Sequence, residues 1–383
     1  MAEAPEIRWR EGSAERTGRW LSPGAPLPSA IGAAGDATTA ASALARARRG
    51  EGLVYQGDYH NARQLLAAMS RRLARTPRGG APADAWRAEL ERRRAGREIL
   101  SRVLVPIETD FRLSLRRAPD VSAALSEALE RRGEPPGLLP LRDLLGMVGA
   151  HEWRRRGVEV PALGARVHPH FGVYAPVRGE YVELVARAAA EWPVAGKRAL
   201  DVGTGTGVLA FVLAKAGAAV IATDVAPGAV ACARENAARL GLADRVQVVE
   251  ADLFPPGEAD LVVSNPPWLP GEAHSPLERA VYDPGGAVLE RLVLGLPEHL
   301  GPAGEAWIVI SDLAELLGLR PPGHLAALAA SAGLRVADVR EARPAHPRAR
   351  EAEDPLRTFR AREVTRLHRL RRIRPASGTR ADQ

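Results

Sequence analysis

Cysteine is nearly absent from this chain of 383 residues, and its single copy, Cys232, lies within a helical pattern. One cysteine excludes an intramolecular disulfide and a CxxC metal site, and it fits a reducing cytoplasm. Long apolar runs are also missing, so no segment is predicted to span a bilayer, and the charged N-terminus lacks the apolar stretch of a signal peptide. We therefore expect a cytoplasmic protein without a membrane partner.

Aromatic residues make up only 4% of the chain, and no basic patch interleaved with aromatics indicates single-stranded nucleic acid. The net charge of +7 is uneven, at +7 for residues 1–160, −6 for 161–340 and +6 for 341–383. Such basic flanks are typical either of a surface that follows phosphates or of a solvated helical surface. His168 and His170 have no acidic or thiol partner at ligand spacing, so no metal is expected.

The periodicity divides the chain into a helical part and an α/β part. Amphipathic helical segments fill residues 36–160 and predict an all-helical substrate-recognition domain. Residues 1–35, rich in proline, glycine and charge, are expected to form a flexible arm. In residues 161–375, strand and helix patterns alternate, which predicts a doubly wound, mainly parallel sheet. A charged loop at 345–354 and a disordered tail at 376–383 complete the prediction.

A glycine-rich stretch joins the first strand of this alternation to its helix. After Asp201 it places Gly203, Thr204, Gly205 and Gly207 in the turn. Because glycine has no Cβ, a ligand can approach the backbone N–H groups at the helix N-terminus. The spacing departs from the GxGxxG of dinucleotide-binding folds. It resembles the first motif of class I S-adenosylmethionine-dependent methyltransferases, which implies a seven-stranded Rossmann-like fold and that cofactor. A tight turn without a ligand is the alternative.

The next two strand ends carry acidic residues. Asp224, followed by Val225, comes one βα unit after the glycine-rich turn, where a carboxylate can accept both hydroxyl groups of a ribose. A helix N-cap is the alternative use of Asp224. Asp252 is expected to reach the adenine amino group, with Leu253 packing on the ring, although a lone aspartate there is also typical of a turn. We count all four residues as candidate cofactor contacts.

The fourth strand ends in Asn265-Pro266-Pro267-Trp268. This resembles the [ND]PP[YFW] motif of methyltransferases that act on a nitrogen in a planar system, and it implies catalytic roles for all four residues. The Asn265 side-chain oxygen and the Pro266 carbonyl can accept the two N–H groups of the acceptor nitrogen and stabilise the charge that develops on it. The prolines stiffen the turn, and Trp268 offers a flat face. The alternative is a proline turn with a tryptophan in the core.

The segment before the glycine-rich turn, GVYAPVRGEYVELV, resembles the one that covers the cofactor in release-factor glutamine methyltransferases and their eukaryotic counterparts. The resemblance implies that Tyr174 contacts the cofactor, with Pro176 and Glu180 as further matches. The chain is similar to the group of release-factor glutamine and small-domain RNA N-methyltransferases.

This resemblance implies transfer of a methyl group from S-adenosylmethionine to a planar nitrogen. The acceptor is either a glutamine amide of a protein, such as a translation-linked factor, or the exocyclic amine of an RNA base. A nicotinamide-dependent oxidoreductase and a non-catalytic binding module on the same fold remain the alternative functions.

Overall fold

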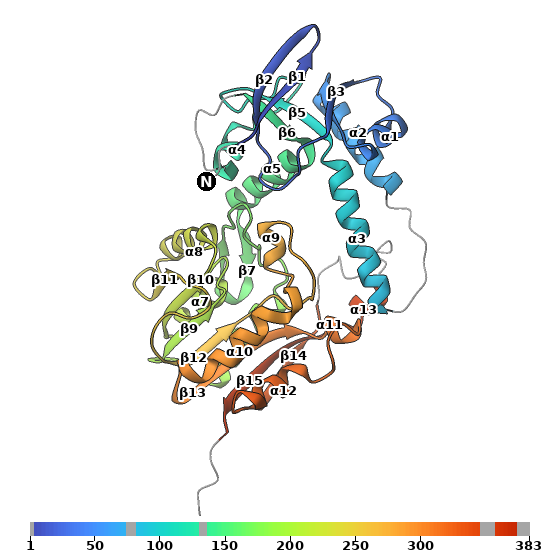
Figure 1. Ribbon diagram of the computed structural model, residues 1–383. Helices are drawn as coiled ribbons and strands as arrows, with labels where there is room; N and C mark the ends of the chain where they lie inside the picture. The colour runs from blue at the N-terminus through green and yellow to red at the C-terminus, as the bar shows by residue number, and fades with distance from the viewer. Residues whose placement is uncertain (1–3, 74–81, 130–135, 345–356, 374–383) are drawn as a thin grey trace, which may run out of the picture. The chain divides into compact units, whose positions relative to one another are not determined.

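The computed structural model describes residues 4–73, 82–129, 136–344 and 357–373 of the chain (Figure 1). These fall into two compact units, Met1–Arg155 and Arg156–Gln383, close to the boundary expected at residue 160. The expected charged loop and the expected C-terminal tail lie outside the described residues. Among the helices in the described part of the chain, none has both the length and the apolar character needed to cross a bilayer.

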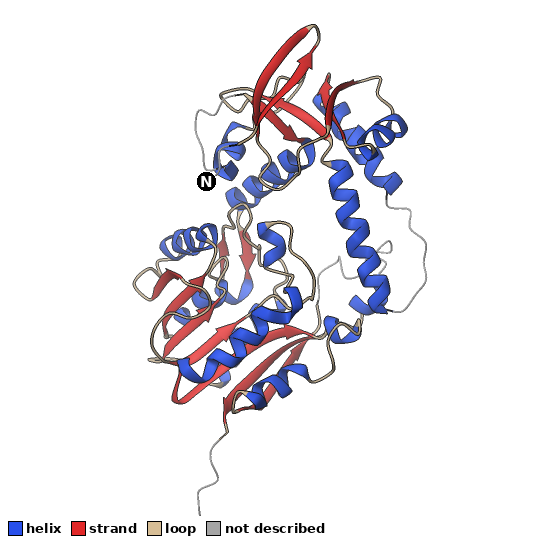
Figure 2. Cartoon of the chain, in the orientation of Figure 1, coloured by secondary structure: helices blue, strands red, loops and turns tan. Residues whose placement is uncertain are grey.

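The N-terminal unit combines helices with a six-stranded sheet (Figure 2). Its helices are α1 (Ala40–Arg48), α2 (Tyr59–Leu73), α3 (Pro82–Leu100), α4 (Ser122–Leu129) and α5 (Leu141–Arg156). Its strands are β1 (Glu6–Glu11), β2 (Ala14–Trp20), β3 (Ala30–Gly35), β4 (Glu51–Gln56), β5 (Val103–Ile107) and β6 (Gly137–Pro140). The strand order is β1-β2-β6-β5-β4-β3, and β3, β4 and β5 run parallel.

This sheet overturns two expectations from the sequence. The prediction of a flexible arm at residues 1–35 is wrong, because this segment forms β1, β2 and β3. In β1 the alternation that marks a strand is present, since Ile7 and Trp9 are buried between charged residues. The prediction of an all-helical domain is also wrong, because β4 and β5 are short, buried runs between helices, and their pairing is not visible in local periodicity.

The C-terminal unit contains the α/β alternation that the sequence predicts. Its strands are β7 (Val158–Val160), β8 (Ala165–Val167), β9 (Arg198–Val202), β10 (Ala219–Asp224), β11 (Val246–Glu250), β12 (Ala259–Ser264), β13 (Leu300–Ser311), β14 (Leu334–Ala342) and β15 (Thr365–Arg372). Its helices are α6 (Glu180–Glu191), α7 (Val208–Lys215), α8 (Pro227–Arg239), α9 (Pro276–Arg279), α10 (Ala287–His299), α11 (Leu313–Leu316), α12 (His324–Ser331) and α13 (Arg357–Arg360), with short 3-10 turns at Pro161–Leu163 and Pro284–Gly286.

Seven of these strands form one sheet in the order β11-β10-β9-β12-β13-β15-β14. Neighbouring strands from β11 to β13 are parallel, whereas β15 is antiparallel to both β13 and β14. The prediction of a mainly parallel, seven-stranded, doubly wound sheet is therefore confirmed. The N-terminus of α7 and the turn after β12 both follow the carboxyl ends of central strands, which is where open α/β sheets bind ligands.

Helices cover both faces of this sheet, as the alternation along its strands requires. In β13, Trp307 and Val309 pack in the core that includes α6, α7 and α8. Ile308 and Ile310, between and beside them, pack in the core that includes α10 and α12. Burial on both faces explains why these strands read as almost continuous apolar runs in the sequence.

Candidate active site

The turn between β9 and α7 depends on its three glycines. Gly203, Gly205 and Gly207 have φ angles of 72°, 55° and 89°, a region that L-amino acids with a Cβ rarely adopt. A Cβ on Gly207 would also lie 2.2 Å from the ring of Phe211, whereas a Cβ on Gly203 or Gly205 would meet no atom within 4 Å. Open space therefore borders the first two glycines, while the third is required by packing.

Asp201, near the end of β9, stabilises this turn by hydrogen bonds. It is only 1% exposed, and its Oδ2 accepts hydrogen bonds from the Thr204 hydroxyl at 2.6 Å and from the Ala210 N–H at 3.0 Å. Burial raises the pKa of the Asp201 carboxyl to about 6. These contacts give Asp201 a role in positioning the turn, and the predicted contact between its side chain and the cofactor stays a prediction.

Asp224 lies at the end of β10, next to the glycine-rich turn. Its Oδ2 accepts the N–H of Gly205 and its Oδ1 accepts the N–H of Ala226, both at 3.0 Å. Each carboxylate oxygen has a second lone pair, so Asp224 can still accept two hydroxyl groups. Val225, beside it, is 64% exposed. Open space at Gly203 and Gly205 together with this acceptor fits a ligand that carries a ribose.

Asp252 and Leu253 follow β11 and differ in their surroundings. Asp252 is exposed and forms an ion pair with Arg291 at 2.7 Å. Leu253 adopts a φ of 66°, its carbonyl accepts the Thr223 hydroxyl at 2.7 Å, and its side chain packs against the core beneath α10. An exposed ion pair is weak, so Asp252 remains available to a ligand.

The strand register brings the NPPW segment beside the glycine-rich turn. In the parallel pair of β12 and β9, Ser264 is opposite Val202, and the Ser264 hydroxyl donates to the Val202 carbonyl at 2.8 Å. Asn265 and Gly203 are therefore the first residues after the ends of two adjacent strands, and adjacent strands are spaced about 4.8 Å apart. Asn265 is half-buried, and Pro266 is buried. The two turns of the sequence prediction thus leave the same edge of the sheet side by side.

Trp268 and the segment before α6 complete this edge. Trp268 packs partly against the core beneath α10. Tyr174 is half-buried. Burial raises the pKa of Tyr181, and electrostatic interactions with Tyr174 and Asp201 add to the rise. Contact of Tyr174 with the cofactor stays a prediction.

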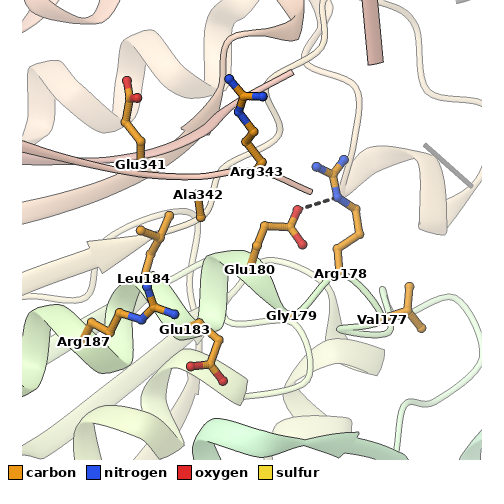
Figure 3. A pocket seen from close by; sticks show the side chains of 10 residues that line it. All are labelled: Val177, Arg178, Gly179, Glu180, Glu183, Leu184, Arg187, Glu341, Ala342 and Arg343. Atoms are coloured by element: carbon orange, nitrogen blue, oxygen red, sulfur yellow. Dashed lines mark hydrogen bonds and ion pairs between the residues drawn. The ribbon is translucent and has the colours of Figure 1, made fainter. Parts of the chain in front are cut away.

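The sequence did not single out Arg178, although it lies over the NPPW segment. The Arg178 Cζ is 5.9 Å from the centre of the Trp268 ring. A cavity of about 620 Å³ extends from this arginine along the start of α6 to the end of β14 (Figure 3). Its lining residues come from 177–187 and 341–343, so it adjoins the site through Arg178 and is not formed by the glycine-rich turn.

Asn236 in α8 is a second residue that the sequence did not single out. It is 1% exposed, donates to the Thr206 carbonyl at 3.2 Å and accepts the His168 N–H at 2.8 Å. It thereby connects the glycine-rich turn to the segment around His168, which precedes α6. A lone asparagine in a helix carries no sequence signal for such a role. Among the residues with described placement, no cluster of three or more His, Cys, Asp or Glu side chains is arranged to hold a metal ion.

Comparison with known proteins agrees with this arrangement. Residues 183–316 match the family model described as the methyltransferase small domain. The release factor glutamine methyltransferase of Deinococcus radiodurans is 36% identical over 228 residues, which cover 58% of this chain and 71% of that protein. The chain belongs to the family of S-adenosylmethionine-dependent methyltransferases that includes the release factor glutamine methyltransferases. S-adenosylmethionine is therefore the cofactor of this methyltransferase.

Other relatives match a shorter part of the methyltransferase. The release factor glutamine methyltransferase of Cereibacter sphaeroides is 38% identical over 148 residues, 35% of this chain and 52% of that protein. A putative protein N5-glutamine methyltransferase of Methanocaldococcus jannaschii is 29% identical over 165 residues, 41% of this chain and 80% of that protein. The chain spans about half the length of the Cereibacter sphaeroides protein and of several other curated relatives. These matches favour methyl transfer over the oxidoreductase and binding-module alternatives.

Proposed function

We propose that this methyltransferase transfers the methyl group of S-adenosylmethionine to the side-chain amide nitrogen of a glutamine in a translation-linked protein, in the cytoplasm. The observation that carries the proposal is the register of β9 and β12, which puts Asn265 next to Gly203. The names of the glutamine methyltransferases among its relatives support the choice of acceptor.

An amide nitrogen is a poor nucleophile because its lone pair is delocalised into the carbonyl group. When bound, S-adenosylmethionine would supply an electrophilic methyl group and leave as S-adenosylhomocysteine, and the methylated nitrogen would release one proton. The Asn265 side-chain oxygen and the Pro266 carbonyl would each accept one N–H of the acceptor amide and orient its lone pair. Positive charge develops on the nitrogen only during transfer, so these two acceptors stabilise the transition state more than the ground state.

Other residues of the chain would position the reacting groups. Asp224 has acceptor capacity left for the ribose hydroxyls after its bonds to Gly205 and Ala226. Pro266 and Pro267 limit the motion of the turn, which preserves the alignment of the acceptor with the methyl group. Trp268 would hold the acceptor side chain against its flat face.

A labelling experiment tests the proposal. The protein of 383 residues would be incubated with tritiated S-adenosylmethionine and, in separate reactions, with a peptide-chain release factor, ribosomal proteins and ribosomal RNA. We expect label in a protein fraction and N5-methylglutamine in its digest. Label confined to RNA would refute the choice of acceptor, and S-adenosylhomocysteine failing to bind the protein would refute the choice of cofactor.

A further inference from the structure

Arg178 is held by two carboxylates from distant parts of the C-terminal unit. Its Nε donates to Glu180 Oε1 at 2.7 Å, and its Nη2 donates to Glu363 Oε1 at 3.0 Å. The Glu363 side chain is only 1% exposed, and the same Oε1 also accepts the hydroxyl of Ser311, at the end of β13, at 2.8 Å. The guanidinium plane is therefore fixed from two sides, and Figure 3 shows its contact with Glu180 at the edge of the cavity.

The same guanidinium lies over Trp268, at 5.9 Å from the ring centre, within the range of a cation–π contact. Burial acts to lower the pKa of Arg178, but the charges of Glu363 and Glu180 outweigh it and keep the pKa raised. Arg178 therefore stays charged.

We propose that Arg178 is a positioning residue for the acceptor group, and that Glu363 and Glu180 orient its guanidinium so that Trp268 presents its face to the acceptor. The inference rests on the proposed function, because it gives Trp268 a role in holding the glutamine side chain. A planar fork is needed to bond both carboxylates while its Cζ lies over the ring, so lysine cannot replace arginine here.

A simpler role for Arg178 would be to neutralise the buried Glu363. The two roles differ in what rescues a variant. Arg178→Met leaves both Glu363 and Glu180 without their charged partner. Arg178→Met combined with Glu363→Gln restores the local net charge and leaves only Glu180, the more exposed of the two carboxylates, without that partner. If neutralisation were the only role, the double variant would regain full turnover. If Arg178 positions Trp268, the double variant regains thermal stability but not turnover.

The kinetic test compares three variants with a matched control. With a peptide-chain release factor as the methyl acceptor, we expect kcat/KM to fall on the order of 10- to 100-fold in Arg178→Lys, Arg178→Met and the double variant, as small misplacements of reacting groups do. The affinity for S-adenosylhomocysteine should change by less than about twofold, since Arg178 acts on the acceptor side. Arg187→Met is the control, because Arg187 lines the same cavity and is exposed. Its kcat/KM should match that of the wild type.

A spectroscopic readout separates this inference from the proposed function. Tryptophans would be labelled with 5-fluorotryptophan, and the ¹⁹F resonance of Trp268 assigned by its loss in Trp268→Phe. We expect this resonance to shift in Arg178→Met and in the double variant but not in Arg187→Met, whether or not any acceptor is methylated. An unchanged Trp268 resonance in Arg178→Met, or wild-type kcat/KM in the double variant, would overturn the inference.

Discussion

Two glycines of the same turn should respond differently to alanine. Gly203 and Gly207 both have positive φ, so either alanine should cost about 1–2 kcal/mol of backbone strain. Only the methyl group at residue 207 also collides with a neighbour, because it would lie 2.2 Å from the ring of Phe211, which is fully buried. Overpacking of this kind adds about 1–3 kcal/mol. Gly207→Ala should therefore lower the free energy of unfolding by about 2–5 kcal/mol, and Gly203→Ala by about 1–2 kcal/mol.

The assay is chemical denaturation of the variants, each made in the chain of 383 residues, paired with titration of S-adenosylhomocysteine. Phe211→Leu shortens the ring, so combined with Gly207→Ala it should cost less than the sum of the single changes. Gly203→Ala should weaken S-adenosylhomocysteine binding in spite of its smaller effect on stability, since its methyl group enters the open space beside the turn. Equal stability losses for the two alanines, or a larger loss at Gly203, would refute this reasoning.

Three further predictions concern ionisable side chains. Burial raises the pKa of Asp201 to about 6, from 3.8, so the native state binds more protons between these values and stability should fall by up to about 3 kcal/mol as pH rises from about 4 to 7. Asp201→Asn should lack this decline, and parallel pH slopes of unfolding for the two proteins would disprove the shift. Burial, with a smaller effect from Arg366, lowers the pKa of His368 to about 4, from 6.5. The unfolded state then binds the proton first, and stability should fall by up to about 3 kcal/mol as pH drops from about 6.5 to 4. This acid sensitivity should be reduced in His368→Leu, and an unaltered acid profile would argue against a neutral His368. Asp224→Ala should weaken S-adenosylhomocysteine binding on the order of 10- to 100-fold by calorimetry, the loss expected for charge-assisted hydrogen bonds, and an unchanged affinity would remove Asp224 from the cofactor site.

The sequence was most informative where function and local geometry depend on the same residues. The glycine-rich stretch predicted a strand–turn–helix unit, and all three of its glycines adopt positive φ. The NPPW segment follows a strand as predicted, and the pairing of Ser264 with Val202 brings the two turns together. Parallel βα alternation makes such an edge predictable, since successive strand ends meet there.

Long-range pairing was not predictable in the same way. The sheet of the N-terminal unit is not evident from the sequence because strands such as β3, with the sequence AIGAAG, consist mainly of small residues and have no clear apolar period. The ion pair of Arg178 with Glu363 joins residues 185 positions apart, and no local pattern marks either partner. Asp201 shows a third limit. The resemblance implied a ligand contact, but its described bonds are to Thr204 in the turn and to Ala210 at the start of α7.

The most direct test of the account is to measure turnover and cofactor affinity together in Asn265→Ala. If Asn265 accepts an N–H of the acceptor nitrogen, kcat should fall by about 10²–10³-fold, as for the loss of one group that stabilises transition-state charge. The dissociation constant of S-adenosylhomocysteine should stay within about twofold of the wild-type value, because the cofactor is held by the glycine-rich turn and Asp224. Wild-type turnover in this variant, or a loss of affinity as large as the loss of turnover, would contradict the proposed site.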